Sequence, residues 1–486
     1  MMNNVYIIYD DSVKVNYNIS SVIGEKTFGE VVYKRLTFQD RFFRLIQKFP
    51  FAKSFYVLKD QEAIFHLMER INELPEDSLF LHIFSNTVIV NEDKFSTLLK
   101  KISYAKESIC IYCADSPVAY VSVGVKDYQQ FLKLALGNKD TMKVFSELER
   151  DVLETDSLSD MNNLSQFLQY ITGGFDARFF NALSGDEYTV TKSSASITKI
   201  KSEYTYYHLL PEDMQRWFVL PYNYQENSES ASYTMERLHM ADIAIRWVHG
   251  AFDKDEFCVL MKRVFYFINS RKTRILDKQS YIKMSRKLYI DKVQQRIEEL
   301  KSHKLYPIIK TYIEKGTEFV SLDDIYSYYE KLFRDVEAEV NRHPIAVIGH
   351  GDLCFSNMLY NKETETLKFI DVKGALKEED LWTNPYYDIA KLSHSVCGRY
   401  DFFNNNMYEI RMNQQMELEL EIDFDNTEYI EIFKEYLQEN KINYRMIRVL
   451  EASLFLSMLP LHMDNPRKVY GFLLNAINIM KEVEKC

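Results

Sequence analysis

Residues 348–360 read IGHGDLCFSNMLY and residues 367–371 read LKFID, and these two runs decide the fold class of the chain. Asp352 comes five residues before Asn357, and Asp371 ends a short apolar run nineteen residues after Asp352. The polar residues between the two runs predict a turn, so the pattern is loop, strand, turn and strand. We expect this hairpin to bring Asn357 and Asp371 together beside Asp352.

These side chains suit phosphoryl transfer from ATP. That reaction needs a carboxylate for the acceptor hydroxyl, oxygen ligands that hold Mg²⁺ against the phosphates, and a cation on the α- and β-phosphates. We predict Asp352 as the base, and Asn357 and Asp371 as the metal ligands, because Mg²⁺ prefers oxygen. His350 is a further candidate, as a brace of the loop rather than a proton carrier. The alternative interpretation is a buried histidine with two surface acids.

The cation is predicted upstream of this motif. Lys192 follows a short strand pattern, and Glu203 lies in the predicted helix 197–209. Kinases pair a strand lysine with a glutamate of the next helix, so we predict that Lys192 binds phosphate and that Glu203 is its ion-pair partner. Lys199 and Lys201 are the alternatives, but both fall on the helix rather than on the strand.

Two weaker features concern the nucleotide. A strand pattern at 232–235 is followed by Glu236 and Leu238, whose backbone groups would meet the adenine if this segment is the hinge between two lobes. A plain strand end is the alternative. Residues 181–186 read NALSGD and form either the turn that covers the phosphates or a surface hairpin.

Two charged residues beyond the metal-binding aspartate have open roles. Asp388, in the run NPYYDIAKL at 384–392, either braces the catalytic loop or begins a helix near its positive end. Lys373 either meets phosphate or an anionic acceptor, or is an exposed turn lysine.

With glycine at 351, where protein kinases have arginine, the run His350-Gly351-Asp352 resembles the form in aminoglycoside phosphotransferases and choline kinases. The resemblance covers roughly residues 179–486. It implies a bilobal protein-kinase-like α+β fold with a helical C-lobe, ATP and Mg²⁺ as cofactors, and a small hydroxylated metabolite as acceptor. It is greatest to the phosphotransferase-family proteins among bacterial capsule and cell-surface polysaccharide enzymes. Choline, ethanolamine, an amino sugar, a free sugar and a polyol are all compatible acceptors.

The N-terminal part has another pattern, in which short apolar runs alternate with helical segments. This predicts an α/β domain with a mostly parallel, Rossmann-like sheet covered on both faces. The domain faintly resembles the nucleotidyltransferase fold that is fused to some bacterial choline kinases. However, residues 10–14 read DDSVK where that fold has a glycine-rich loop with arginine, and Ser85-Asn86 stand where it has a metal-binding aspartate. We therefore expect a degenerate domain used for binding or for homodimerisation.

The predicted organisation has four parts. They are an N-terminal α/β domain at 1–136, a helical connector at 137–178, a kinase-like N-lobe at 179–240 and a helical C-lobe with the catalytic loop at 241–486.

Composition excludes several classes of protein. The 486 residues carry a formal charge of −11, which argues against a dedicated nucleic-acid binder. No apolar run reaches the length of a membrane span and no signal peptide is visible, so we expect a cytoplasmic protein. Six scattered cysteines indicate free thiols in a reducing compartment, and the C-x-x-C pair of Cys110 and Cys113 lies in a strand pattern without a second pair.

The leading hypothesis is thus an ATP- and Mg²⁺-dependent kinase that phosphorylates a hydroxyl of a sugar, amino alcohol or related metabolite. Two alternatives stay open: a bifunctional kinase and nucleotidyltransferase, and a pseudokinase scaffold in a surface-polysaccharide assembly.

Overall fold

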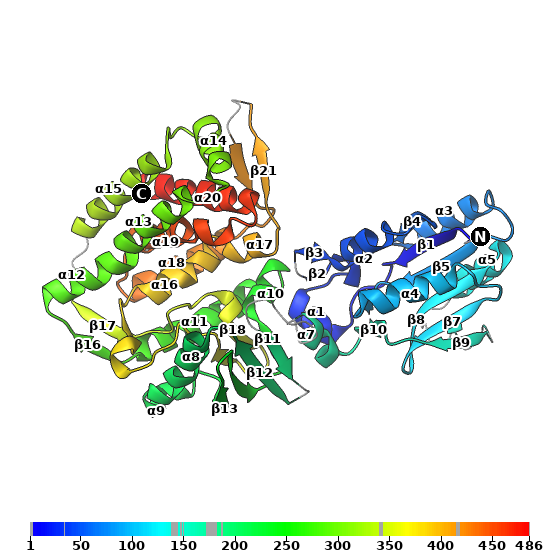
Figure 1. The fold of residues 1–486 in the computed structure, drawn as a ribbon, viewed down its shortest axis with the longest axis horizontal. Coiled ribbons are helices and arrows are strands. Elements are labelled where there is room, and N and C mark those ends of the chain that lie inside the picture. Colours follow the sequence, from blue (N-terminus) through cyan, green and yellow to red (C-terminus); the bar gives the residue numbers. More distant parts are fainter. Residues whose placement is uncertain are drawn as a thin grey trace. The chain divides into compact units, whose positions relative to one another are not determined.

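The computed structural model describes residues 3–33, 35–137, 144–145, 148, 150–171, 182–185, 188–339, 344–414 and 418–485. The chain divides into two compact units, Met1–Phe175 and Asp176–Cys486 (Figure 1). Within the described ranges, no helix combines the length and the apolar character needed to cross a bilayer.

The first unit alternates strands with helices. Its elements are β1 (Val5–Asp10), α1 (Tyr17–Ile23), η1 (Phe28–Glu30), β2 (Val32–Tyr33), β3 (Leu36–Thr37), α2 (Phe38–Ile46), β4 (Ala52–Leu58), α3 (Gln61–Ile71), β5 (Leu79–Phe84), β6 (Thr87–Ile89), α4 (Glu92–Ile102), β7 (Ile109–Cys113), β8 (Ser116–Val123), α5 (Val125–Gly137), β9 (Asp151–Glu154), β10 (Leu158–Asp160) and α7 (Leu164–Ile171).

The main sheet of this unit has the strand order β4-β1-β5-β8-β7-β9. β1 pairs in parallel with β4 and β5, and β7 pairs in parallel with β9, whereas β8 runs antiparallel to both β5 and β7. Five of these six strands therefore run in one direction and β8 alone runs in the other, so the sheet is mostly parallel but mixed. The reason is local: β7 and β8 are joined by a tight turn at Ala114, and only antiparallel strands can be connected by so short a turn.

Each face of this sheet has its own hydrophobic core. Side chains of α2 and α4 pack on one face, and side chains of α3 and α5 pack on the other. β1 shows the alternation that this requires, since Ile7 and Tyr9 join the first core and Ile8 joins the second. The N-terminal sheet is thus covered on both faces.

The stretch predicted as a helical connector is different in the structure. It contributes β9, which pairs with β7 at the edge of the main sheet, and β10, which pairs with β6. The first unit therefore extends to Phe175, well beyond residue 136. Polar, helix-prone composition misleads here because an exposed edge strand such as Asp151–Glu154 has little apolar pattern.

The second unit begins with strands and becomes largely helical. Its elements are β11 (Ala182–Gly185), β12 (Thr189–Ser194), α8 (Ile197–Leu209), α9 (Glu212–Gln215), β13 (Pro221–Glu226), β14 (Ala231–Glu236), β15 (Ala241–Asp242), α10 (Ile243–Val248), α11 (Lys254–Ser270), β16 (Thr273–Ile275), α12 (Lys278–Arg286), η2 (Lys287–Asp291), α13 (Lys292–Lys301), α14 (Tyr306–Gly316), α15 (Leu322–Glu339), β17 (Ile345–Ile348), η3 (Phe355–Asn357), β18 (Met358–Asn361), β19 (Thr366–Phe369), η4 (Glu378–Leu381), β20 (Trp382–Thr383), α16 (Tyr387–Val396), α17 (Tyr400–Asn404), β21 (Glu409–Met412), β22 (Leu418–Glu421), α18 (Thr427–Glu439), α19 (Tyr444–Met458), η5 (Leu459–His462) and α20 (Pro466–Lys485).

The N-lobe of this unit is an antiparallel sheet with the order β11-β12-β14-β13, and α8 packs against it. Ile200 of α8 is fully buried against Ala231 and Tyr233 of β14 in a small core. The pairing of β12 with β14 places Lys192 directly opposite Tyr233. Helix α8 therefore covers the sheet face that carries Lys192.

The C-lobe contains a large, continuous hydrophobic core. Helix α19, which is buried over most of its length, contacts α13, α15, α16 and α20 (Figure 1). Three small sheets lie in the described part of this lobe: β15-β18-β19, β16-β17-β20 and β21-β22. The arrangement, a strand-rich lobe followed by a mostly helical one, is the bilobal α+β organisation that the sequence predicts.

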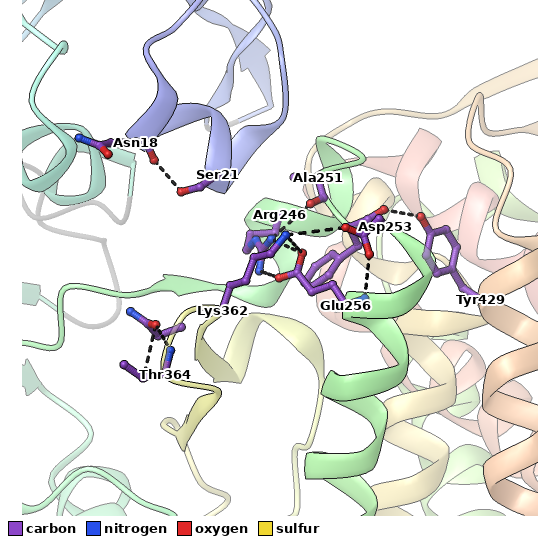
Figure 2. A network of polar contacts seen from close by, with 11 residues as sticks. Asn18, Ser21, Arg246, Ala251, Asp253, Glu256, Lys362, Thr364 and Tyr429 are labelled. Carbon is purple, nitrogen blue, oxygen red and sulfur yellow. Dashed lines mark hydrogen bonds and ion pairs between the residues drawn. The ribbon is translucent and has the colours of Figure 1, made fainter.

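An ion-pair network that is buried at Arg246 and Glu256 and exposed at Lys362 contacts the β18–β19 hairpin (Figure 2). Arg246 of α10 pairs with both carboxylate oxygens of Glu256 on α11, at 2.5 and 2.9 Å. Lys362, in the turn between β18 and β19, lies 3.2 Å from Glu256 and 3.7 Å from Asp253. The turn of the hairpin is thereby attached to the start of α11, where Glu256 is also paired with Arg246 of α10.

Candidate active site

The structure brings Lys192, Glu203 and Asp371 into one cluster, in which Lys192 and Glu203 are buried and Asp371 reaches the surface. The Nζ atom of Lys192 lies 2.6 Å from Oε2 of Glu203 and 2.8 Å from Oδ1 of Asp371. The side chains of Lys192 and Glu203 are each 3% exposed, whereas that of Asp371 is 48% exposed. Burial lowers the pKa of Lys192, but the two carboxylates outweigh it and raise the pKa, so the ammonium stays charged.

The tertiary contacts of α8 explain why these residues meet. Tyr233 donates a hydrogen bond to Oε2 of Glu203 at 3.1 Å, which fixes the carboxylate toward Lys192. At the other side of the helix, Tyr206 donates to the carbonyl of Gly349 at 2.9 Å, and the carbonyl of Ser202 accepts from the amide of Ala375 at 2.9 Å. Helix α8 therefore connects the N-lobe lysine with the C-lobe loop.

The alternative lysines take other positions. Lys199 is 52% exposed and lies 3.9 Å from Glu203, and Lys201 pairs with Glu226 at 3.2 Å near the surface. Neither has the central, buried position of Lys192.

A narrow cleft, open to solvent, lies between the two lobes beside this cluster. Its walls include Glu203, Tyr233 and Met235 from the N-lobe, and Phe369, Ile370 and Asp371 from the C-lobe. An apolar cleft with a few convergent charges at one end is the usual form of a small-molecule site.

Asp352 and Asn357 form a second group on the C-lobe. The side-chain amide of Asn357 donates to the backbone carbonyl of Asp352 at 2.8 Å and to its Oδ2 at 3.2 Å. Lys391 of α16 lies 2.8 Å from Oδ1 of the same carboxylate. Burial raises the pKa of Asp352, but Lys391 with Asn357 outweighs it and lowers the pKa, so the carboxyl is ionised at neutral pH.

His350 is a structural brace in this loop. The amide of Asp352 donates to its Nδ1 at 3.1 Å, so Nε2 carries the proton and donates to the carbonyl of Ile370 at 2.9 Å. The side chain is fully buried, and desolvation lowers its pKa. Both ring nitrogens are therefore used by backbone groups, and His350 has neither the exposure nor a free nitrogen to act on a substrate. These contacts fit the predicted role of His350 as a brace of the loop rather than a proton carrier.

Asp388 fixes the backbone of the loop at His350 and Gly351. Its Oδ2 accepts from the amide of His350 at 3.0 Å and its Oδ1 from the amide of Gly351 at 2.8 Å. Oδ2 also accepts from Arg271 at 3.0 Å, and both side chains are buried. Of the two roles left open by the sequence, Asp388 has the bracing one.

Gly351 is required by the backbone at this point. Its φ is +80°, a conformation that other residues rarely adopt. A Cβ atom at Gly351 would lie 2.5 Å from the Cβ of Lys373. Lys373 itself is exposed and donates its backbone amide to the carbonyl of His350, so it packs beside the catalytic loop.

The hairpin register places the two predicted metal ligands next to each other. Met358 pairs with Phe369, and the amide of Ile370 donates to the carbonyl of Asn357 at 3.0 Å. Asn357 donates through its side-chain nitrogen, so its side-chain oxygen is the atom that can bind a metal. Asp371 has an exposed carboxylate, and its backbone is left-handed, with φ of +56°. These oxygens fit Mg²⁺, which takes one or two protein ligands and completes its shell with phosphate and water.

The predicted hinge residues lie where the lobes join. Glu236 ends β14, and Leu238 lies in the segment between β14 and β15. The amide of Arg237 donates to the carbonyl of Tyr188 at 2.8 Å. The predicted phosphate-covering turn at 181–186 falls partly outside the described residues.

In the first unit, the two carboxylates at the end of β1, Asp10 and Asp11, are the residues to compare with a nucleotidyltransferase site. Asp10, at the end of β1, lies 3.1 Å from Nε2 of His82. Asp11 accepts from the amide of Gly29 at 2.8 Å and from the hydroxyl of Thr27 at 2.7 Å. Both carboxylates are thus engaged by the unit's own side chains and backbone, which gives no support to nucleotidyl transfer.

Three residues of the site lack a motif in the sequence. Arg271 is 117 residues from Asp388, and Tyr206 is 143 residues from Gly349, so only the fold brings each pair together. For Lys391 the sequence contains one weak indication of a place in the site: it follows Asp388 by three residues, so the two side chains share a face of α16.

Comparison with known proteins gives distant structural likenesses. No protein-family model matches the sequence, and no curated protein matches it. A thermostable mutant of aminoglycoside phosphotransferase APH(4)-Ia is 11% identical, covers 65% of this chain and 98% of its own, and has a TM-score of 0.33.

Two further solved structures are similar to the same degree. A putative fructosamine-3-kinase from Haemophilus somnus 129PT is 12% identical over 66% of this chain and 96% of its own, with a TM-score of 0.36. An aminoglycoside-3'-phosphotransferase of type VIII is 13% identical over 57% of this chain and 87% of its own, with a TM-score of 0.34. Scores at this level do not by themselves assign a function to the chain.

Proposed function

We propose that the second unit is an ATP- and Mg²⁺-dependent phosphotransferase that phosphorylates a hydroxyl of a sugar, amino alcohol or related small metabolite. The observation that carries the proposal is the position of the Lys192 ammonium between two carboxylates from separate segments. Its Nζ atom lies 2.6 Å from Oε2 of Glu203 and 2.8 Å from Oδ1 of Asp371. A buried lysine between a helix carboxylate and an exposed strand-end carboxylate is an arrangement suited to hold nucleotide phosphates beside a metal ion.

Each side chain then has a role. Lys192, oriented by Glu203, binds the α- and β-phosphates, and Asn357 with Asp371 holds Mg²⁺, which neutralises phosphate charge when it is bound. Asp352 accepts the hydrogen bond of the acceptor hydroxyl, directs the oxygen at the γ-phosphorus, and takes the proton as the bond to phosphorus forms. The O–H bond of the acceptor and the bond from the γ-phosphorus to the β-γ bridging oxygen break, and ADP and the phosphate ester are released.

The adenine is proposed to enter the cleft between the lobes. The cavity beside Met235 and Phe369 is lined by apolar side chains, and the segment of Glu236 and Leu238 offers backbone groups at its edge. The contacts of Asp10 and Asp11 in the first unit favour a role of that unit in binding or assembly.

The experiment is a comparison of Asp352→Asn with the native chain. The substitution keeps the shape of the side chain but removes the base, and its single carboxamide oxygen can keep only one of the contacts to Lys391 and Asn357. ADP formation with a panel of hydroxylated metabolites should therefore fall by about 10²–10⁴-fold. Binding of Mg-ATP, measured by calorimetry, should change little. Asp464→Asn, at an exposed aspartate, is the matched control. Full activity of Asp352→Asn, or no binding of Mg-ATP by the native chain, would contradict the proposal.

A further inference from the structure

Lys373 is an exposed lysine whose side chain lies along the catalytic loop. A Cβ atom built on Gly351 would be 2.5 Å from Cβ, 3.3 Å from Cγ and 3.0 Å from Cδ of Lys373, so the aliphatic stem of the lysine covers this glycine. The amide of Lys373 also donates to the carbonyl of His350 at 3.0 Å. Lysines often pack the stem in this way while the ammonium stays in solvent. Lys373 is thus held beside Gly351, the residue before the proposed base.

The residues that follow Lys373 are fastened to helix α8. Gly374 has a φ of +88°, and a Cβ atom there would lie 2.5 Å from Oγ of Ser202. The amide of Ala375 donates to the carbonyl of Ser202 at 2.9 Å. The segment is therefore bound to the catalytic loop on one side and to the helix of Glu203 on the other. The tertiary structure, and not a free turn, sets the position of Lys373.

The ammonium of Lys373 is not committed to a carboxylate. Between the described residues of the second unit, no ion pair involves Lys373. By contrast, Lys192 is shared between Glu203 and Asp371, at 2.6 and 2.8 Å, and Lys391 lies 2.8 Å from Oδ1 of Asp352. Lys373 therefore places beside the loop a positive charge that the carboxylates of the site do not already bind.

The γ-phosphoryl group is the part of the substrate complex to which the roles proposed above give no lysine. Negative charge is spread over its three equatorial oxygens as it is transferred. Lys192 is assigned to the α- and β-phosphates, and the γ-phosphorus has to lie close to Asp352, since that carboxylate directs the acceptor oxygen at it. A cation anchored on Gly351 is next to this position.

We propose that Lys373 is a further catalytic residue, whose ammonium binds oxygens of the γ-phosphoryl group and stabilises the charge that develops on them. The inference rests on the proposed phosphotransferase function and deepens it. The acceptor oxygen forms a bond to the γ-phosphorus, the bond to the β-γ bridging oxygen breaks with its electron pair left on ADP, and the acceptor proton passes to Asp352. Lys373 gives and takes no proton, and it lowers the barrier through its charge. Among the roles that the sequence leaves open for Lys373, this is contact with phosphate.

The first measurement compares the affinity for Mg-ATP with that for Mg-ADP, which lacks the γ-phosphate. Calorimetry is done with the full native chain, with Lys373→Met, which keeps an unbranched stem over Gly351, and with Lys373→Arg, which keeps the charge. Lys373→Met should lower the affinity for Mg-ATP at least about fivefold and leave that for Mg-ADP within about twofold, because it loses a charge-assisted contact to the γ-phosphate. Lys373→Arg should retain the native ratio of the two affinities. A purely structural role would change both affinities alike.

The second measurement is ADP formation with the panel of hydroxylated metabolites. Lys373→Met should lower kcat at least about tenfold and leave KM for the acceptor within about threefold, whereas Lys373→Arg should retain most of the native kcat. Lys377→Met, at an exposed lysine of the same segment, is the matched control for loss of one charge and should resemble the native chain. If Lys373→Met does not fold, Lys373→Gln replaces it in both measurements.

The outcomes separate this inference from the proposed function. A native chain that does not bind Mg-ATP overturns the proposed function, and the inference with it. A native chain that binds Mg-ATP, together with a folded Lys373→Met of native kcat or of native affinity ratio, overturns the inference and leaves the kinase intact. If the panel contains no acceptor, the affinity ratio and the slow hydrolysis of ATP by water decide, and an unchanged ratio in Lys373→Met overturns the inference.

Discussion

Replacement of Asp388 by alanine tests how the catalytic loop is held. Asp388 is fully buried and accepts from two backbone amides and from Arg271. Its removal leaves a buried guanidinium without its partner carboxylate, which typically costs about 3–5 kcal/mol, and each orphaned amide adds about 1–3 kcal/mol where water cannot reach it. We therefore expect a loss of at least about 5 kcal/mol in the free energy of unfolding of the second unit.

Urea unfolding followed by tryptophan fluorescence measures this loss selectively. The three tryptophans of the chain, Trp217, Trp247 and Trp382, all lie in the second unit. With a urea m-value of about 3 kcal/mol/M, a loss of 5 kcal/mol lowers the midpoint by about 1.7 M. Asp335→Ala, at an exposed aspartate of α15, should change the midpoint by less than about 0.3 M and is the matched control.

A double variant separates stability from positioning. Adding Arg271→Met to Asp388→Ala removes the unpaired charge, so part of the stability should return. Turnover should not return, because the amides of His350 and Gly351 are still without their acceptor; we expect kcat to stay about 10²-fold below native. A midpoint within 0.3 M of native in Asp388→Ala, or recovery of full turnover in the double variant, would refute this account of the loop.

Two further predictions concern Lys192 and Asp401. Lys192→Met removes two charge-assisted hydrogen bonds to the buried cluster and the proposed phosphate contact, so kcat/KM for ATP should fall at least about 10²-fold in initial-rate assays, whereas Lys201→Met should have little effect. Burial raises the pKa of Asp401 to about 7, so between its ordinary pKa and pH 7 the folded chain binds a proton that the unfolded chain lacks, and stability falls as pH rises. Asp401→Asn should therefore raise Tm at pH 8 and have a much smaller effect at pH 4.5 in thermal unfolding; equal shifts at the two pH values would contradict this assignment.

Much of the fold follows from local pattern. The short apolar runs of the first unit form strands where the sequence predicts them, because a strand that is buried on both faces is apolar at successive positions, and helix α8 lies at 197–209 as predicted. The sequence was less informative at sheet edges. The edge strand β9 is exposed along its length, so no buried face marks it, and the direction of β8 depends on a tight turn rather than on the composition of the strand.

The candidate site likewise has some features that the sequence predicts and others that depend on the tertiary structure. By itself, the sequence determined the chemical types and their spacing around Asp352, Asn357 and Asp371, because these residues lie at short, fixed offsets along one segment. Only the tertiary structure decided that Lys391 binds Asp352 and that Arg271 and Asp388 support the loop. These contacts join separate helices and distant segments, and local periodicity carries no information about which helix faces meet.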